Sequence, residues 1–403
     1  MKILFVNAYY NGGGAELVVR QLYHGVKMDG IESYCIIGRW QKNIPEEIEV
    51  IYSHFLERVS TTIIGGVLNN TLLKTRKARK KIIELIEKES IDIVHFHNMH
   101  SNYIGMKDIE EISQHCSKIV ITLHDMWLLT GGCAHACECE KWKTEECKGC
   151  SGNYSMKPFK LAHKLFEKKR EIFADSKIYF VTPSKWLYDK VKQSYLKNTD
   201  IRIINNGIEL NEFQEHSKVE MRKKYDLPLD KNILLFVANG MNNIYKGFTY
   251  LLKALNMLNE KEKYVLLIVG NKDGEIIELP YETYMMGYVS SHTVMNELYS
   301  AADLYIHPSM ADVYPFTVME SLASGTPVVA FRTGGIPEIV REDVGWLVEP
   351  GNYNKLKECI EYIFQNKVSL ENKTIKCREY IEQNNGIDKT ILNYRKLYFD
   401  IMN

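Results

Sequence analysis

Two carboxylates and a helix N-terminus lie close together in one short stretch of the sequence, residues 302–339. Asp312 lies in a polar loop and Glu320 follows eight residues later inside a predicted helix, a little over two helical turns away. Between them, the backbone N–H groups of Phe316 and Thr317 point out of the helix N-terminus, which is an anion-binding position. An acid, an anion site and a second acid suit a sugar–diphosphate–ribose ligand. The alternative is an ordinary strand–helix–strand unit in which the acids bind no ligand.

Short apolar runs alternate with helical stretches around these residues and through both halves of the chain. Residues 304–306 and 327–330 read as strands. A helix is predicted over residues 316–324, because Pro315 suits its start and Gly325 its end. This alternation predicts an α/β protein with two doubly wound parallel sheets, which bind ligands at the carboxyl ends of their strands.

Residues 308–330 resemble the donor-binding segment of the retaining glycosyltransferases of family 4, in which seven residues separate two glutamates. The matching positions are Pro308, Ser309, Glu320, Ala323, Gly325 and residues 327–330. Two positions differ: Asp312 replaces the first glutamate, and Pro315, which has no N–H to donate, replaces a glycine. The resemblance implies the GT-B fold, in which two Rossmann-like domains face one another across a cleft.

The resemblance also implies roles for residues of the second half. Glu320 would hold the donor's ribose, and Asp312 would act as a catalytic residue that binds hydroxyl groups of the transferred sugar. Lys246 would neutralise the diphosphate; the alternative is an ordinary surface lysine. The other donor contacts implied are Tyr288, whose segment resembles the one that reads the base, and the N–H groups of Phe316 and Thr317. No Asp-x-Asp pair marks a metal site, so catalysis is expected to need no cofactor.

A glycine-rich loop opens the first half. Gly13 and Gly14 lie between a predicted strand at residues 2–7 and a helix, as in the first unit of a doubly wound sheet. With Ala15 and Glu16 they resemble the family's G-G-A-E loop, which faces the donor diphosphate and the acceptor. We therefore assign the two glycines to the donor and Glu16 to the acceptor side; a simple tight turn is the alternative.

Three further residues mark strand ends in the first half. His97 ends the sequence D-I-V-H-F-H, whose family counterpart lines the cleft, here assigned to the acceptor side. His124 follows a strand at residues 118–123, and its family counterpart lies beside the donor sugar, which implies a catalytic role in orienting a hydroxyl group. Asp125 would steer that imidazole or contact the acceptor. A core histidine with satisfied hydrogen bonds is the alternative for His124.

Five cysteines lie within residues 131–152. Cys133, Cys139, Cys147 and Cys150 would supply four thiolates for a tetrahedral zinc site with Zn–S bonds of ~2.3 Å. Their spacing resembles that of a family 4 subset of the colanic-acid or capsular-polysaccharide type. Four protein ligands leave no open position, which predicts structural zinc. Free thiols and disulfides remain as alternatives.

Composition narrows the class of protein. With 403 residues, 45% apolar content and zero net charge, the chain suits an ordinary two-domain protein and gives no sign of nucleic acid as a partner. No apolar run reaches the ~20 residues of a membrane span, and the first residues are too few for a signal peptide. Nine cysteines without such a signal favour a reducing compartment, so we expect a cytoplasmic protein. Basic residues at 74–81 suit either peripheral contact with an anionic membrane on its inner face or a solvated helix face.

We expect an N-terminal, acceptor-side domain at residues 1–187, a nucleotide-sugar domain at 188–375 and a helix at 376–403 that returns to the first domain. The resemblance implies a retaining transferase that moves a sugar from a nucleotide-sugar, with UDP favoured, to a glycan or lipid-linked oligosaccharide in surface polysaccharide synthesis. Two alternatives remain. One is a GT-B-type sugar-nucleotide epimerase. The other is a non-catalytic glycan-binding partner, favoured by the departures at Asp312 and Pro315 and by Met241, which lies in the region where family members usually carry an arginine.

Overall fold

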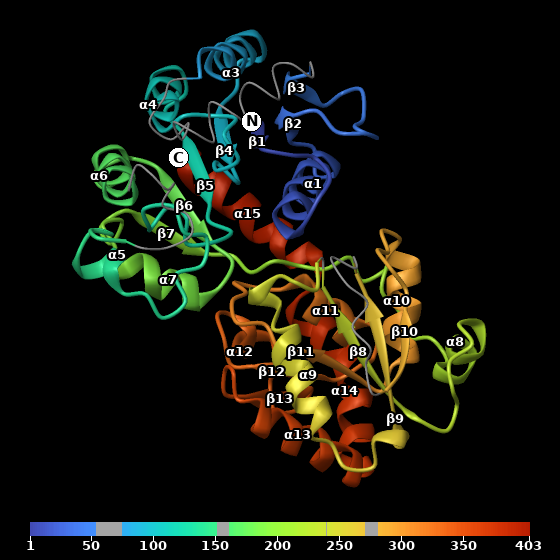
Figure 1. Ribbon diagram of the computed structural model, residues 1–403. Coiled ribbons are helices and arrows are strands. Elements are labelled where there is room, and N and C mark those ends of the chain that lie inside the picture. The colour runs from blue at the N-terminus through green and yellow to red at the C-terminus, as the bar shows by residue number, and fades with distance from the viewer. Residues whose placement is uncertain (54–74, 151–160, 239, 271–280) are drawn as a thin grey trace. The chain divides into compact units, whose positions relative to one another are not determined.

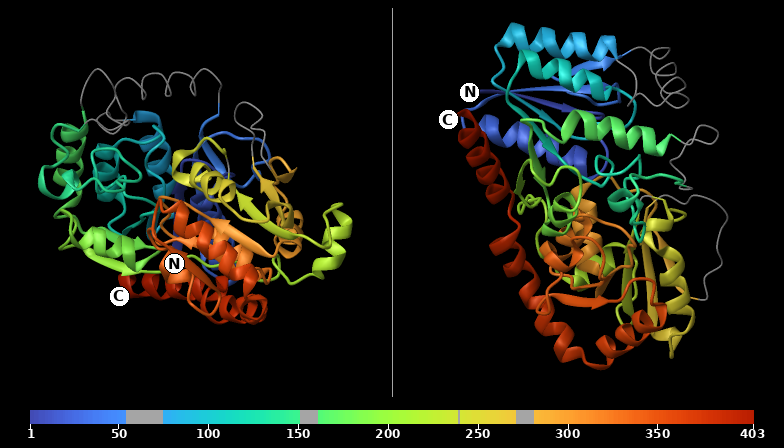
Figure 2. Two further views of the ribbon diagram at one scale, coloured as in Figure 1. Left: turned by 60° about the horizontal axis from the view of Figure 1, so that its bottom comes forward. Right: turned by 90° about the vertical axis from the view of Figure 1, so that its left-hand side faces the viewer.

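The computed structural model describes residues 1–53, 75–150, 161–238, 240–270 and 281–403 (Figure 1). These residues form two compact units. The first is Met1–Asn205 with Thr390–Asn403, and the second is Asn206–Lys389. Both ends of the described chain therefore belong to the first unit (Figure 2).

The expected domain boundaries fall inside helices. Residue 187 lies in α7 (Lys185–Lys192) and residue 375 lies in α14 (Lys367–Asn384). The first unit extends further because β7 (Asp200–Ile203) pairs with β6 (Tyr179–Thr182) and so completes the first sheet. The chain passes between the units after Asn205 and again after Lys389, since α14 belongs to the second unit.

The first unit is built on a parallel sheet with the strand order β3-β2-β1-β4-β5-β6-β7. Its other strands are β1 (Lys2–Asn7), β2 (Glu32–Arg39), β3 (Glu49–Tyr52), β4 (Ile93–Phe96) and β5 (Ile119–Thr122). Its other helices are α1 (Gly14–Met28), α3 (Arg76–Glu89), α4 (Met106–His115), α5 (Lys141–Thr144), α6 (Ala162–Phe173) and α15 (Ile387–Met402). The connection through α1 runs from β1 to β2, and the one through α3 runs in the opposite direction across the sheet, from the edge strand β3 to β4. Right-handed crossovers therefore place these helices on opposite faces (Figure 2).

The C-terminal helix α15 is anchored in this unit by two buried tyrosines. The Tyr398 hydroxyl lies 2.8 Å from Nδ1 of His95, and the Tyr394 hydroxyl lies 2.9 Å from Oγ1 of Thr122. Ile391 packs directly over Gly25 of α1, where an added Cβ would come within 2.3 Å of it. The helix is therefore part of the core of the first unit.

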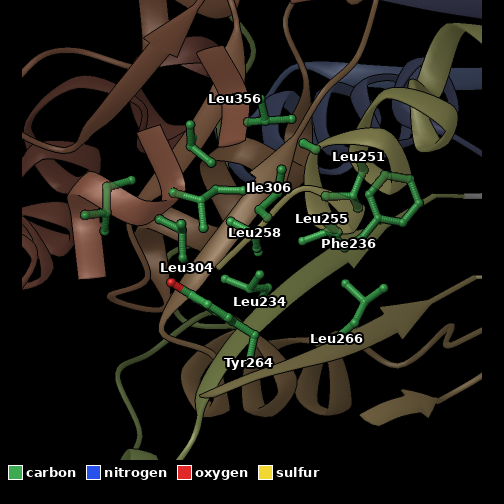
Figure 3. Packing of buried hydrophobic residues seen from close by; sticks show 14 of the residues in the cluster. Leu234, Phe236, Leu251, Leu255, Leu258, Tyr264, Leu266, Leu304, Ile306 and Leu356 are labelled. Atoms are coloured by element: carbon green, nitrogen blue, oxygen red, sulfur yellow. The ribbon is translucent and has the colours of Figure 1, made fainter. Parts of the chain in front are cut away.

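The second unit contains a parallel sheet with the order β10-β9-β8-β11-β12-β13. Its strands are β8 (Asn232–Val237), β9 (Tyr264–Val269), β10 (Glu282–Met285), β11 (Leu304–His307), β12 (Val328–Phe331) and β13 (Gly345–Val348). Its other helical elements are α8 (Lys218–Lys224), η2 (Ile244–Lys246), α9 (Phe248–Asn256), η3 (Lys261–Lys263), α10 (His292–Ala301), α11 (Phe316–Ala323), α12 (Ile336–Ile339) and α13 (Tyr353–Gln365). Leucine, isoleucine and phenylalanine side chains from β8, β9, β11 and α9 form its core (Figure 3).

The helix predicted between the two acids is present as α11. Pro315 is its N-cap residue, with φ −74° and ψ 127°, and Ser324 is its C-cap residue. Gly325 follows with a φ of +79°, in the left-handed region where glycine is favoured. The predicted strands on both sides are β11 and β12, so this part of the sequence prediction is confirmed.

Candidate functional site

Several of the predicted site residues lie where each sheet reverses its strand order. In the second sheet the reversal lies between β8 and β11; Lys246 follows the first of these strands and Asp312 the second. In the first sheet it lies between β1 and β4, which lead to Gly13 and His97. Open α/β sheets bind ligands at the carboxyl ends of strands at such points. Both units therefore carry some of their predicted site residues at an edge where such sheets usually bind ligands.

Asp312 and Lys246 form an ion pair in the second unit. The lysine Nζ lies 3.1 Å from both carboxylate oxygens, and His307 Nε2 lies 3.0 Å from Oδ2. On the other side of the ring, the Tyr305 hydroxyl lies 2.8 Å from His307 Nδ1. With Asp312 ionised, His307 donates from Nε2 and accepts from Tyr305 at Nδ1, which fixes its tautomer.

Charge stabilises the ionised form of this carboxylate. Burial alone would raise the pKa of Asp312, but the charge of Lys246 and the hydrogen bond from His307 lower it below its ordinary value. Burial lowers the pKa of His307, although Asp312 opposes this shift. The cluster therefore holds a neutral imidazole between a tyrosine and an ion pair at neutral pH.

Two glycines let these loops approach one another. Gly247 has a φ of +72°, and a Cβ there would lie 1.8 Å from the carbonyl oxygen of Pro308. Gly334 has a φ of +55°, and a Cβ there would lie 1.7 Å from the carbonyl oxygen of Asp312. Any other residue would force the loops apart, so the glycines fix where Lys246 and Asp312 stand.

Helix α11 begins four residues after Asp312 and contains Glu320. Phe316 and Thr317 are its first two residues, and their N–H groups have no partner within the helix. The Tyr299 hydroxyl donates to Oε2 of Glu320 at 3.0 Å. Burial raises the pKa of Glu320, and the hydrogen bond from Tyr299 opposes this shift. Tyr288 follows β10 and is 61% exposed.

In the first unit, His124 is held by His97. Nδ1 of His97 lies 2.9 Å from Nε2 of His124, and their rings are stacked 5.2 Å apart. His97 is only 1% exposed, and its Nε2 has no hydrogen-bond partner among the described residues. Burial lowers the pKa of His124 to about 4. The structure thus gives His97 a direct contact with His124 and little surface of its own for an acceptor.

Asp125 is paired with a histidine that the sequence analysis did not select. His100 Nε2 lies 3.0 Å from Oδ2 of Asp125, and the Trp127 N–H donates to Oδ1 at 2.7 Å. Burial alone would raise the pKa of Asp125, but the hydrogen bond and charge of His100, together with the hydrogen bond from the Trp127 N–H, lower the pKa below its ordinary value. The aspartate is therefore ionised and oriented by this loop, and no hydrogen bond to the His124 ring is present among the described residues.

The glycine-rich loop leads into α1 as predicted. Gly13 is the N-cap residue of α1 and Gly14 its first residue, and both are exposed. Glu16 is 8% exposed, and its Oε1 accepts a hydrogen bond of 3.3 Å from Asn98 Nδ2. Glu16 is thus tied to the segment that follows β4.

All nine cysteines lie in the described residues and none of them forms a disulfide, so the disulfide alternative is not supported. Burial raises the pKa of Cys133 to about 11, and the charges of Cys150, Cys147 and Cys139 act in the same direction. The four thiols predicted as zinc ligands therefore belong to one region of the loop, although no three of their sulfurs lie within 4.8 Å of one another. By contrast, burial and Glu138 account for the raised pKa of Cys137.

Two family models match the chain. One, described as glycosyltransferase family 4, matches residues 12–212, and the other, described as glycosyl transferases group 1, matches residues 217–384. Together they cover most of the chain. The chain belongs to glycosyltransferase family 4. Its fold is GT-B, with two Rossmann-like domains.

The relatives of this transferase are distant. A putative colanic acid biosynthesis glycosyl transferase of Escherichia coli, WcaC, is 25% identical over 370 residues, or 86% of each chain. The Escherichia coli UDP-Gal:alpha-D-GlcNAc-diphosphoundecaprenol alpha-1,3-galactosyltransferase is 24% identical over 83% of this chain and 82% of its own.

Solved structures share the fold at lower identity. A sucrose-phosphate synthase from Thermosynechococcus elongatus has a TM-score of 0.79 at 17% identity, covering 100% of this chain and 99% of its own. Anabaena HepE in complex with UDP-glucose has a TM-score of 0.71 at 16% identity, covering 99% of this chain and 100% of its own.

The basic segment of this transferase makes several contacts within the protein. Lys74 lies outside the described residues. Arg79 pairs with Glu111 at 3.0 Å, and Lys81 donates to the carbonyl oxygen of Val50 at 2.8 Å. These cations are therefore partly engaged already. Among the described residues, no helix combines the length and apolar character needed to span a membrane.

Sequence reasoning missed the residues that support the site. His307 stands at the carboxyl end of a parallel strand, so the rule that selected His124 also applied to it. Two residues gave no signal: Tyr299, which donates to Glu320, and Lys169, a buried lysine whose Nζ donates to the carbonyl oxygen of Thr130 at 3.0 Å. A tyrosine in a helix and a lysine in a basic amphipathic helix are common without any such role. Only the packing of α10 and α6 reveals them.

Proposed function

We propose that this family 4 glycosyltransferase is a retaining enzyme that moves a sugar from a nucleotide-sugar, with UDP as the favoured nucleotide, to a glycan or lipid-linked oligosaccharide in surface polysaccharide synthesis. The names of two relatives support this choice, since one concerns colanic acid biosynthesis and the other a UDP-Gal donor and a diphosphoundecaprenol acceptor. The HepE structure with UDP-glucose supports a UDP donor for the same fold.

One observation carries the donor assignment: a cation, a helix N-terminus and an acid surround the reversal point of the second sheet. Lys246 and the N–H groups of Phe316 and Thr317 would bind the diphosphate, and Glu320 would accept hydrogen bonds from the ribose. Tyr288 is exposed on the segment that would meet the base.

The same groups would assist departure of the diphosphate. Negative charge grows on the leaving phosphate as the bond to the sugar breaks, and Lys246 and the α11 N-terminus are fixed donors for that charge. Family resemblance implies transfer on one face of the sugar, with the leaving phosphate accepting the proton of the acceptor. Asp312 and His124 would bind sugar hydroxyls and orient the anomeric carbon.

Asp312 has a second role in this proposal. Its carboxylate already accepts from Lys246 and His307, so it also positions the lysine that binds the diphosphate. Lys246 has three N–H donors, of which Asp312 uses at most two, so at least one stays available for a phosphate oxygen.

The acceptor is assigned to residues of the first unit. Asp125 and Glu16 would contact acceptor hydroxyls, with His97 acting through its contact with His124. The proposal places the reaction in the cytoplasm, at the inner face of the membrane when the acceptor is lipid-linked. Direct membrane contact through residues 74–81 has less support, because several of these cations are engaged within the protein.

Calorimetric titration with UDP, GDP and ADP tests the donor assignment. UDP should bind, and Lys246→Ala and Glu320→Ala should each weaken it by about 10–100-fold, since hydrogen bonds to charged groups contribute ~1.5–3 kcal/mol. Lys355→Ala and Glu358→Ala, which remove an exposed pair on α13, are matched controls and should bind UDP normally.

A second measurement follows donor turnover. Transfer with retained anomeric configuration, when UDP-sugars are offered with lipid-linked acceptors, is the expected result. Conversion of the UDP-sugar without acceptor would indicate an epimerase instead. UDP binding with no turnover over a broad acceptor panel would indicate a non-catalytic partner and overturn the transferase proposal.

A further inference from the structure

Residues 131–150, which follow β5, contain thiols that the transfer reaction does not explain. Cys147 is buried, Cys133 and Cys150 are partly buried, and Cys139 is exposed. The charges of Cys139 and Cys150 act on both Cys133 and Cys147, whereas Cys137 is not among the groups that act on either of them. Four cysteine side chains are a complete ligand set for structural zinc.

The backbone of the loop is arranged around one of these sulfurs. The Gly131 N–H donates to Sγ of Cys147 at 3.2 Å. Cys147 and Gly149 both have positive φ angles, +56° and +58°, so the chain turns sharply between Cys147 and Cys150. A Cys-x-x-Cys turn with an N–H group pointing at sulfur suits a thiolate bound to a metal, because the donor stabilises negative charge on sulfur.

A buried lysine lies beside these thiols. Lys169 of α6 is 0% exposed, and its Nζ donates to the carbonyl oxygens of Trp127 and Thr130, the latter at 3.0 Å. Its Nζ also lies 3.6 Å from the centre of the Trp127 ring. Among the described residues no carboxylate forms an ion pair with it. The charges that act on it are those of Asp125, Cys147 and Cys133.

A buried cation is costly without a nearby anion. Asp125 is already bonded to His100, so it compensates Lys169 only in part. Zinc bound by four thiolates carries a net charge of −2, because four protons leave when Zn²⁺ binds. Such a site next to Lys169 would supply the missing negative charge, and the lysine would offset half of the charge of the site.

We propose that Cys133, Cys139, Cys147 and Cys150 bind a structural zinc ion and that Lys169 is the buried cation that joins this site to the loop carrying Asp125. Two further hydrogen bonds tie the same parts together. The Met126 N–H donates to the carbonyl oxygen of Ala134 at 2.8 Å, and the Thr130 hydroxyl donates to that of Cys133 at 2.8 Å. Zinc would therefore hold the Asp125 loop in place.

A different group of residues competes for a metal at this loop. Ligand atoms of Glu146, His163 and Glu167 lie within 4.8 Å of one another. In the described part of the chain, no three of the cysteine sulfurs lie that close together. Metal binding would thus draw the thiols together. The glutamate–histidine group is less suitable, since Glu146 already pairs with Arg170 and Lys148.

The metal content of the full-length chain tests this proposal independently of sugar transfer. Protein purified with reductant and without chelator should contain about one zinc per chain. Replacement by Co²⁺ should give the absorption spectrum of tetrahedral thiolate coordination. Cys139→Ser and Cys150→Ser should lose the metal, while Cys137→Ser, which removes a neighbouring thiol, should keep it.

Two further variants separate the parts of the proposal. Lys169→Met should bind zinc about 10–100-fold more weakly in chelator competition, the usual effect of losing a supporting partner, and unchanged affinity would refute the role of the lysine. Glu167→Gln should leave the zinc content unchanged. If Glu167→Gln lost zinc while Cys139→Ser kept it, the metal would be bound by Glu146, His163 and Glu167 instead of the cysteines. A metal-free chain with nine reactive thiols, even after incubation with zinc, would overturn the proposal.

Discussion

Gly334→Ala tests whether close approach of two loops positions the donor site. Gly334 has a φ of +55°, and the carbonyl oxygen of Asp312 lies 1.7 Å from where a Cβ would stand, half of the 3.4 Å at which ordinary contact begins. An alanine in the left-handed region costs ~1–2 kcal/mol by itself. The overlap adds to this, because Asp312 must move away by a similar distance.

That movement breaks specific bonds. The Gly335 N–H donates to the Asp312 carbonyl oxygen at 3.2 Å, a hydrogen bond that contributes ~0.5–1.5 kcal/mol. The side chain of Asp312 would also leave Lys246 and His307, now 3.1 and 3.0 Å away. We therefore expect a total cost of about 3–5 kcal/mol, with UDP affinity reduced at least ~10-fold because Lys246 loses its support.

Gly351→Ala is the matched control. Gly351 belongs to the same unit and has a φ of +73°, but a Cβ there would meet only Tyr250, at an ordinary 3.5 Å. It should cost ~1–2 kcal/mol and leave UDP binding unchanged. Calorimetry should show the UDP-stabilised transition about 10 °C lower in Gly334→Ala and a few degrees lower in the control, since 1 kcal/mol shifts a domain of this size by ~2–4 °C. Equal shifts with equal UDP affinities would refute the reasoning.

Three further predictions concern charge and the buried network. Because its pKa is lowered in the folded state, Asp312 stabilises the fold above its unfolded pKa of ~3.9 and loses this effect as pH falls below that value. The free energy of unfolding, measured with denaturant between pH 6 and 3, should therefore depend less on pH in Asp312→Asn. The same pH dependence in both proteins would contradict this. His124, with its pKa at about 4, should remain neutral from pH 8 to 5, so its titration should not change kcat/KM in that range. A fall in kcat/KM near pH 6.5 that disappears in His124→Asn would contradict this. Tyr398→Phe leaves buried His95 short of a partner and should cost ~1–3 kcal/mol in urea unfolding of the first unit, whereas Tyr362→Phe, at a side chain that is 54% exposed, should cost almost nothing.

Local signals in the sequence were sufficient to predict the α/β architecture. Apolar runs of four to six residues became the parallel strands, and proline and glycine marked the ends of α11, because such signals depend on backbone geometry within a few residues. The domain limits were less well predicted. The first unit continues to Asn205, since β7 joins the first sheet through pairing with β6, and no local pattern shows which sheet a strand will join.

The partners of the site residues were beyond reach of the sequence. Glu320 was selected for its spacing from Asp312, but its hydrogen bond to Tyr299 comes from packing between α10 and α11. Lys169 was one lysine in a basic helix, and only the fold shows that it is fully buried. Such contacts join residues far apart in the chain, so motif spacing carries no information about them.

Asp312 shows how a departure from a family pattern acquires a physical meaning. As a sequence feature, this aspartate, one methylene shorter than the family's glutamate, is a departure that favours a non-catalytic partner. In the fold, its carboxylate reaches Lys246 and His307 together. His307 is bonded in turn to the hydroxyl of buried Tyr305, so buried side chains hold the ion pair in place. We therefore interpret the aspartate as part of the support for the lysine at the donor site, and the non-catalytic alternative loses one of the sequence departures that favoured it.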